Sequence, residues 1–257
     1  MTTALVHHYK ADANVYKDAG TTLCSDGDTV QQWNDQVGTL HLTMSSATHR
    51  PMYNTNQLNS LPGIKFLASG SPYDSGVWYR LTTANTSFGN QVDADYEIMA
   101  VFKLNVWQTD SHTFQGPLNA ILWGCGNDFV LSCRLTPPAP SSADPQGIIL
   151  TTGHTAPYLP SDLKTGHFCI MDCWADKTDA STNSQVNGGT AEKSFQSPGI
   201  ITTQPFSIGG PGTVPVTDLL YQYANMEYCE ILMYNCKLDD TTRANAIAYL
   251  NGKWAVY

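Results

Sequence analysis

The sequence predicts an all-β protein, a two-sheet antiparallel sandwich with one C-terminal helix, and three observations carry this prediction. Short segments rich in β-branched and aromatic residues alternate with clusters of Gly, Pro, Asn and Asp along almost the whole chain. Charged residues make up only 14 % of the chain, which excludes coiled coils and acidic disordered tails. The length of 257 residues suits one large β domain, so we expect a single domain over residues 1–257.

The clearest strand patterns are short runs of aliphatic and aromatic residues bounded by turn-forming residues. They occupy residues 101–104, 120–123, 129–131, 147–150 and 229–234. Residues 136–145 contain four prolines, and proline has no amide hydrogen to donate to a neighbouring strand. This stretch is therefore predicted to be a loop.

One helix is predicted near residues 240–252. Either Asp239 or Asp240 can cap its first turn, and Gly252 can end it. Three apolar side chains recur at helical spacing and form one stripe: Ile247, Leu250 and Trp254. We expect this stripe to pack on the edge of the sandwich.

Charge and hydropathy exclude several classes of partner. The 13 Lys+Arg against 22 Asp+Glu give a net charge of −9, which opposes binding to nucleic acid. The first residues lack a basic region followed by an apolar run, and no stretch approaches the ~18 apolar residues of a membrane span. We therefore expect no nucleic-acid partner, no signal peptide and no membrane span.

The seven cysteines are an odd number and contain no Cys-x-x-Cys pair that could hold zinc. Mostly free, buried thiols are expected. Cys125 and Cys133 flank a predicted hairpin, so a bridge between these two is the alternative.

The two ends of the chain carry motifs in a characteristic order. They are Tyr9-Lys10-Ala11-Asp12, Trp33-Asn34-Asp35-Gln36-Val37-Gly38, Arg50-Pro51, Tyr234-Asn235 and Lys253-Trp254. This order resembles the concanavalin A-like lectin/glucanase superfamily, and within it the laminin-G-like jelly-roll modules of bacteria and their viruses. The resemblance is specific over residues 7–68 and 200–257, and it implies two stacked antiparallel sheets with one concave face and loops at its rim.

Two of these motif residues are expected to be structural. Trp33 precedes an Asn-Asp turn and is interpreted as a core anchor rather than a ligand platform. The proline after Arg50 forces the arginine into an extended conformation, from which its guanidinium can hold a loop carboxylate.

The sequence offers no catalytic residues. Glucanases of the superfamily that this chain resembles carry Glu-x-Asp-x-x-Glu on one strand, which places two carboxylates about 5–5.5 Å apart for retaining hydrolysis. The four glutamates of this chain lie outside such a motif. Glu227 and Glu230 are three residues apart on a predicted strand and are expected to face opposite sides, with Glu230 in a structural role. We therefore predict that the protein is not an enzyme.

A weak metal candidate lies before the run of residues 98–102. Asp93, Asp95 and Glu97 alternate, so they share one face of a strand. We interpret them as a solvated start of that strand, with a calcium site as the alternative. No other cofactor is predicted, because no His pair has the spacing of a helical zinc site.

Candidates for ligand binding are aromatic residues near polar, turn-rich segments, because sugar rings stack on Trp and Tyr. They are Trp78, Tyr79, Trp107, Tyr158 and Trp174. The competing interpretation is burial in the core, where most tryptophans of a sandwich lie.

Three functions follow as hypotheses. The first is a non-catalytic virion surface protein, such as a decoration, fibre or tail component, which binds carbohydrate in adhesion. This hypothesis rests on the expected absence of a signal peptide. A protein that acts outside the cell then needs another exit from the host cytoplasm, and assembly into a virus that is released by lysis supplies one. The alternatives are a free-standing lectin-like protein, bacterial and cytoplasmic or released by lysis, and a disfavoured glycoside hydrolase.

The virion hypothesis also specifies partners. With few charged residues, the surface is expected to contact other virion proteins or identical copies through uncharged loops and aromatic side chains. We therefore expect the protein to form a homo-oligomer. Its other expected partner, from the adhesion role, is a cell-surface or matrix glycan.

Overall fold

The computed structural model describes residues 5–69, 77–84, 95–106, 118–125, 129–135, 148–151, 166–194, 205–209 and 225–257. These residues form two large antiparallel sheets, a two-stranded sheet of β7 (Ala68–Ser69) and β8 (Val77–Trp78), a 3₁₀ turn at Ala47–His49, and helix α1 (Asp240–Trp254). The predicted all-β, two-sheet sandwich with one C-terminal helix is confirmed. In this part of the chain, no helix is both long and apolar enough to cross a membrane.

The first sheet has the order β16-β15-β14-β10-β18-β6-β5, and β1 pairs with the C-terminal half of β18. Its strands are β1 (Leu5–Lys10), β5 (Met52–Leu58), β6 (Leu61–Phe66), β10 (Tyr96–Val106), β14 (Phe168–Asp176), β15 (Ser181–Val186), β16 (Glu192–Ser194) and β18 (Asn225–Tyr234). The long strands β10, β14 and β18 lie together in its middle. They form the platform on which the site described below is built.

The second sheet has the order β13-β12-β11-β17-β9-β4-β3-β2. Its strands are β2 (Val15–Tyr16), β3 (Gln32–Trp33), β4 (Leu42–Thr43), β9 (Leu81–Thr82), β11 (Leu118–Cys125), β12 (Phe129–Leu135), β13 (Ile148–Thr151) and β17 (Phe206–Ile208). The five segments predicted as strands fall on β10, β11, β12, β13 and β18. The predicted loop at 136–145 lies outside the described residues.

The main core fills the space between the two sheets. Trp33 of the second sheet is fully buried there, with its ring 5.8 Å from that of Tyr9 and its Nε1 donating to the Lys10 carbonyl at 2.9 Å. Its predicted role as a core anchor is confirmed.

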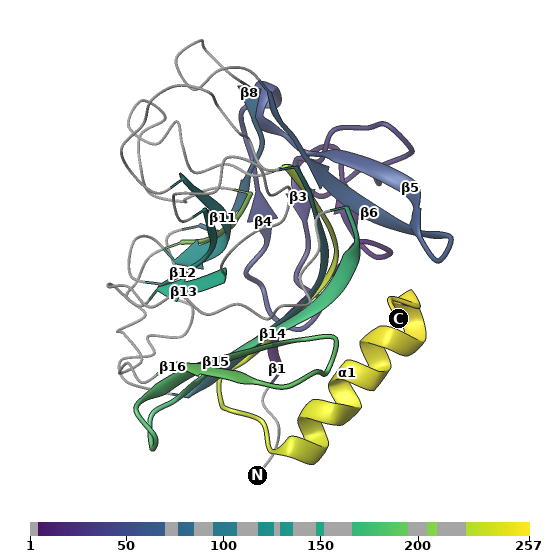
Figure 1. Ribbon diagram of the computed structural model, residues 1–257. Helices are drawn as coiled ribbons and strands as arrows, with labels where there is room; N and C mark the ends of the chain where they lie inside the picture. Colours follow the sequence, from purple (N-terminus) through teal and green to yellow (C-terminus); the bar gives the residue numbers. More distant parts are fainter. Residues whose placement is uncertain are drawn as a thin grey trace.

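A second core covers the other face of the first sheet. Met99 and Val101 of β10 face it, whereas their neighbours Ile98 and Phe102 face the main core. Both faces of β10 are therefore buried, which explains why its residues 98–102 form a continuous apolar run rather than an alternating pattern. Figure 1 shows the cause: α1 lies along the first sheet, on the opposite side of the molecule from β11–β13.

The helix stripe is confirmed, but its predicted position is wrong. Ile247, Leu250 and Trp254 pack on Met99, Val101, Ile170 and Leu232, so α1 covers the central strands of the sheet and not the edge of the sandwich. The predicted stop is also wrong, because the helix runs past Gly252 to Trp254.

Both ends of α1 are capped, the first by a side chain and the second by a backbone hydrogen bond. At the start, the Oδ1 atom of Asp239 accepts the Thr242 N–H at 2.9 Å, which confirms a predicted cap. At the end, Ala255 takes the left-handed conformation (φ 51°) and donates its N–H to the Asn251 carbonyl at 2.8 Å.

The turn after β3 is organised by Asp35. Its Oδ2 is 2.6 Å from His7 Nδ1, and its Oδ1 accepts the N–H groups of His8 at 2.9 Å and Val37 at 3.1 Å. Burial opposes ionisation, but these hydrogen bonds, led by that of His7, lower the pKa of Asp35 to about 2. A Cβ at Gly38 would lie 2.6 Å from Asp35 Oδ2, so this turn requires glycine.

Two further expectations are corrected by the structure. Arg50 donates to the carbonyls of Met44 and Ser45, both at 3.0 Å, and to no carboxylate of the described residues. The register of β11 and β12 pairs Cys125 with Phe129, and Cys133 with Ala120, so the two cysteines lie too far apart along the ladder for a disulfide. The expected free thiols are confirmed at five cysteines: Cys24, Cys169, Cys173, Cys229 and Cys236.

Candidate functional site

Three ionisable side chains meet beneath the first turns of α1 and form the Glu97 cluster, defined as Glu97, Asp172 and Arg243. The guanidinium of Arg243 is bidentate to Glu97, with Nε–Oε1 at 2.9 Å and Nη2–Oε2 at 2.8 Å, and its Nε lies 3.4 Å from Asp172 Oδ2. Glu97 and Asp172 are fully buried and Arg243 is 6 % exposed. The expected solvated strand start is therefore wrong at Glu97, because the helix covers this strand.

The Glu97 cluster contains two carboxyl groups and one cation. Burial, reinforced by the charge of Glu97, raises the pKa of Asp172 well above its ordinary value. Burial also raises the pKa of Glu97, although Arg243 acts in the opposite direction. The two buried carboxyl groups share one cation, so burial opposes ionisation of both at once.

A separate network ties α1 to β1 and β18 through Glu230. This fully buried carboxylate accepts from four donors: His8 Nε2 at 2.6 Å, Tyr249 Oη at 2.8 Å, Lys253 Nζ at 2.6 Å and Trp254 Nε1 at 2.8 Å. Burial opposes ionisation, but the hydrogen bonds of His8 and Lys253 lower the pKa of Glu230 to about 2. The predicted structural role of Glu230 is confirmed.

Glu227 and Glu230 lie on the same face of β18, contrary to the prediction from their spacing. The register shifts between Glu230 and Tyr228, which indicates a bulge at Cys229. Tyr228 and Ile231 both point into the main core, so the two glutamates point away from it. Glu227 is held there by Gln57, Asn105 and Lys103.

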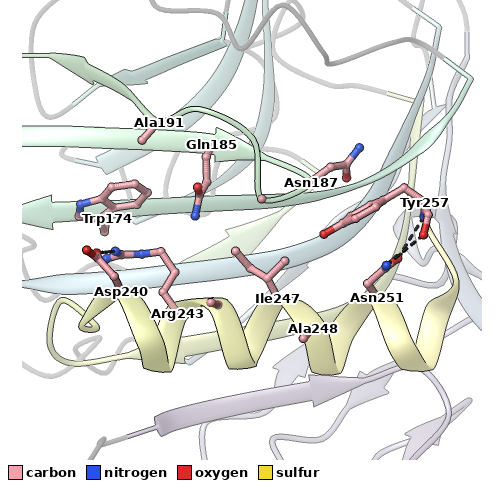
Figure 2. A pocket seen from close by; sticks show the side chains of 12 residues that line it. Trp174, Gln185, Asn187, Ala191, Asp240, Arg243, Ile247, Ala248, Asn251 and Tyr257 are labelled. Carbon is pink, nitrogen blue, oxygen red and sulfur yellow. Dashed lines mark hydrogen bonds and ion pairs between the residues drawn. The ribbon is translucent and has the colours of Figure 1, made fainter.

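A cavity of about 650 Å³ opens between α1 and the strands β14 and β15, and we call it the helix pocket. Figure 2 shows side chains from the strands facing side chains from the helix across this space. Its lining is Trp174, Gln185, Asn187, Gly188, Ala191, Asp240, Arg243, Ala244, Ile247, Ala248, Asn251 and Tyr257.

The walls of the helix pocket combine an aromatic ring with small apolar groups. Trp174 is 6 % exposed, and the Arg243 guanidinium lies 4.1 Å from its ring centroid, so one face of this ring is covered. Ala244, Ile247 and Ala248 supply apolar surface from the helix. The pocket thus has the mixed lining typical of small-molecule sites, with a volume in the usual range of about 300–1,000 Å³.

Polar atoms at the pocket retain hydrogen-bonding capacity. Gln185 is 8 % exposed, and its Nε2 donates to Asp172 Oδ2 at 2.7 Å. Asn187 uses its Oδ1 to accept the Ile170 N–H at 2.8 Å. Among the described residues, no partner is present for Gln185 Oε1, for Asn187 Nδ2 or for the hydroxyl of Tyr257.

The structure brings one of the five aromatic candidates to this pocket. Trp174 lines it, whereas Tyr79 is partly buried and packs against the main core. Trp78 lies in β8, but its side chain is outside the described part of the chain, as are Trp107 and Tyr158 entirely.

The metal candidates do not come together in the described residues. Asp95 Oδ1 accepts the Lys177 N–H at 2.7 Å, Glu97 belongs to the Glu97 cluster, and Asp93 is outside the described residues. In the described ranges, no group of three or more His, Cys, Asp and Glu side chains is placed to hold a metal ion.

Sequence reasoning missed most of the pocket. Gln185 and Asn187 are ordinary polar residues whose significance depends on the helix packing opposite them. One signal was available: Arg243 lies four residues before Ile247 and therefore continues the buried stripe of α1.

Solved structures provide the comparison with known proteins. A GH54 α-L-arabinofuranosidase soaked with a cyclic sulfate inhibitor matches 98 % of this chain with a TM-score of 0.60 and 11 % identity. Trypanosoma rangeli sialidase in complex with the inhibitor DANA matches 97 % with a TM-score of 0.52 and 13 % identity. The receptor-binding domain of botulinum neurotoxin type G matches 96 % with a TM-score of 0.52 and 10 % identity. What this chain shares with these proteins is the fold, which in this chain is a two-sheet antiparallel β-sandwich.

The likeness extends to the fold alone. This chain spans 33 % of the sialidase, 51 % of the neurotoxin domain and 63 % of the arabinofuranosidase. No family model matches the sequence, and no curated protein matches it.

Proposed function

We propose that this protein is a non-catalytic glycan-binding β-sandwich and that its ligand occupies the helix pocket. The observation that carries the proposal is the pocket itself: a cavity of about 650 Å³ with an aromatic wall, apolar helix residues and unpaired amide and hydroxyl groups. Sugars present both apolar C–H faces and hydroxyl groups, so they match a lining of this kind.

The arrangement of carboxyl groups supports binding rather than hydrolysis. Glycoside hydrolysis needs two carboxyl groups that flank the scissile bond. Beside the pocket, Glu97 and Asp172 are buried and face Arg243, so neither is presented to a ligand. Glu230 is occupied by four donors.

A glycan array tests the proposal with two matched variants. Ala248 is exposed and lines the pocket, so Ala248→Phe should fill the cavity and reduce glycan binding at least about tenfold. Asn245 is exposed on the same helix and does not line the pocket, so Asn245→Phe should leave binding unchanged. If the two variants bind glycan equally well, the ligand does not bind in the helix pocket.

We further propose membership of the concanavalin A-like superfamily and its laminin-G-like jelly-roll modules. Support comes from three parts of the motifs that carry the resemblance, because each has a structural task. Trp33 anchors the core, the Asp35–Gly38 turn binds β1, and Lys253-Trp254 binds Glu230.

The virion surface role extends this proposal, with other coat proteins or identical copies as partners. What supports it is the composition, since only 14 % of residues are charged and uncharged surfaces favour packing between subunits. Native mass and association with virus particles should then persist at raised salt, because screening does not weaken apolar contacts. A monomer that is absent from any particle and binds glycan would favour the free lectin.

A further inference from the structure

The guanidinium of Arg243 is the cation at the helix pocket, and it is already hydrogen-bonded to groups of the protein. Among the described residues that line the pocket, Arg243 alone carries a positive charge. Its Nε and Nη2 bind Glu97, Nη2 also donates to the Leu238 carbonyl at 3.0 Å, and Nη1 donates to Asp240 at 3.0 Å. These bonds use four of the five N–H groups of a guanidinium.

The exposed charge at the pocket is negative. The side chain of Asp240 is fully exposed at the start of α1, where it lines the pocket beside Arg243 (Figure 2). Arg243 faces three carboxyl groups, those of Glu97, Asp172 and Asp240, and only that of Asp240 is exposed to a ligand. An anionic ligand would therefore meet a like charge and no free cation, which costs binding free energy.

The groups that remain available are uncharged. Gln185 Oε1 accepts, Asn187 Nδ2 donates, and the Tyr257 hydroxyl does both. Gln185 Oε1 has no partner among the described residues and is accessible at the pocket, so it is available to a ligand donor. A neutral hydroxyl group, which both donates and accepts, satisfies this set, and Ile247 offers apolar contact for a sugar C–H face.

We infer that the helix pocket selects uncharged saccharides and rejects sialylated and sulfated ones. This inference rests on the proposed glycan-binding function and names its ligand class. Selection comes from two features together: the commitment of Arg243 to buried protein carboxylates, and the exposed carboxylate of Asp240.

The test compares neutral and acidic glycans that share one core. Wild-type protein is titrated by calorimetry with lactose and sialyllactose, and with N-acetyllactosamine and its sialylated and sulfated forms. We expect the neutral member of a pair to bind at least about tenfold more tightly than its acidic derivative.

Two variants assign the selectivity to the pocket. Asp240→Asn removes the exposed negative charge, so it should raise the affinity for the acidic glycan relative to the neutral one. Asp12→Asn makes the same change in net charge away from the pocket and should leave that ratio as in the wild type.

The outcomes separate this inference from the proposal on which it rests. If acidic glycans bind as tightly as their neutral cores, the inference is overturned and glycan binding stands. If Asp240→Asn leaves the ratio unchanged, selection by the pocket charge is overturned. If no glycan on an array binds the wild type, the proposed function and the inference both fail.

Discussion

Replacing Arg243 by Met removes the only cation of the Glu97 cluster while keeping an unbranched chain over the Trp174 ring. Arg243 is 6 % exposed and its partner Glu97 is fully buried, so the substitution leaves a buried carboxylate unpaired. Loss of one partner of a buried pair costs about 3–5 kcal/mol. In a chain of this size each kcal/mol lowers Tm by about 2–4 °C.

Urea unfolding followed by tryptophan fluorescence measures this loss. The loss should be smaller at pH 4.5 than at pH 7, because without Arg243 the buried Glu97 takes up a proton and no longer carries an unpaired charge. Lys237→Met is the matched control: its ion pair with Asp176 is partly exposed and should contribute at most ~1 kcal/mol. A loss below ~1 kcal/mol for Arg243→Met, or equal losses at both pH values, would refute the reasoning.

Four more substitutions test the fold. Folding raises the pKa of Asp172, so the stability that this residue contributes is complete below its ordinary pKa of about 4 and is lost as the pH rises through its folded pKa. In urea unfolding, Asp172→Asn should therefore make the free energy of unfolding fall less steeply above about pH 4 than in the wild type. Gly38→Ala should lower the free energy of unfolding by about 1–3 kcal/mol, because its Cβ would lie 2.6 Å from Asp35 Oδ2. Gly252→Ala, which has open space around it in α1, should raise that free energy by about 0.5–1 kcal/mol. The opposite sign for either change would contradict this account. Trp254→Ala should cost about 3–5 kcal/mol in the same assay, and a loss below ~1 kcal/mol would show that this ring does not anchor the helix.

The sandwich was predictable because its signals are local. The apolar strand segments and the stripe of Ile247, Leu250 and Trp254 depend on neighbours in sequence, and the structure confirms both. The position of α1 was not predictable in the same way. Whether a stripe packs on an edge or on a face depends on which strands lie in the middle of the sheet, and that is decided by pairings between residues far apart.

The site was less predictable for the same reason. Glu97 resembles a solvated residue in the sequence, and only the approach of Arg243, 146 residues later, buries it. The bulge at Cys229 also has no local signal, yet it reverses the expected side of Glu227 relative to Glu230. That residues 1–257 form one domain stays a prediction.

The most direct test of the central claim is a crystal structure of the protein with the tightest-binding neutral oligosaccharide from the array. The account predicts electron density for the sugar between α1 and β15, with hydroxyl groups bonded to Gln185 Oε1 and Asn187 Nδ2. Density for the sugar at another place, with the helix pocket holding only solvent, would contradict it.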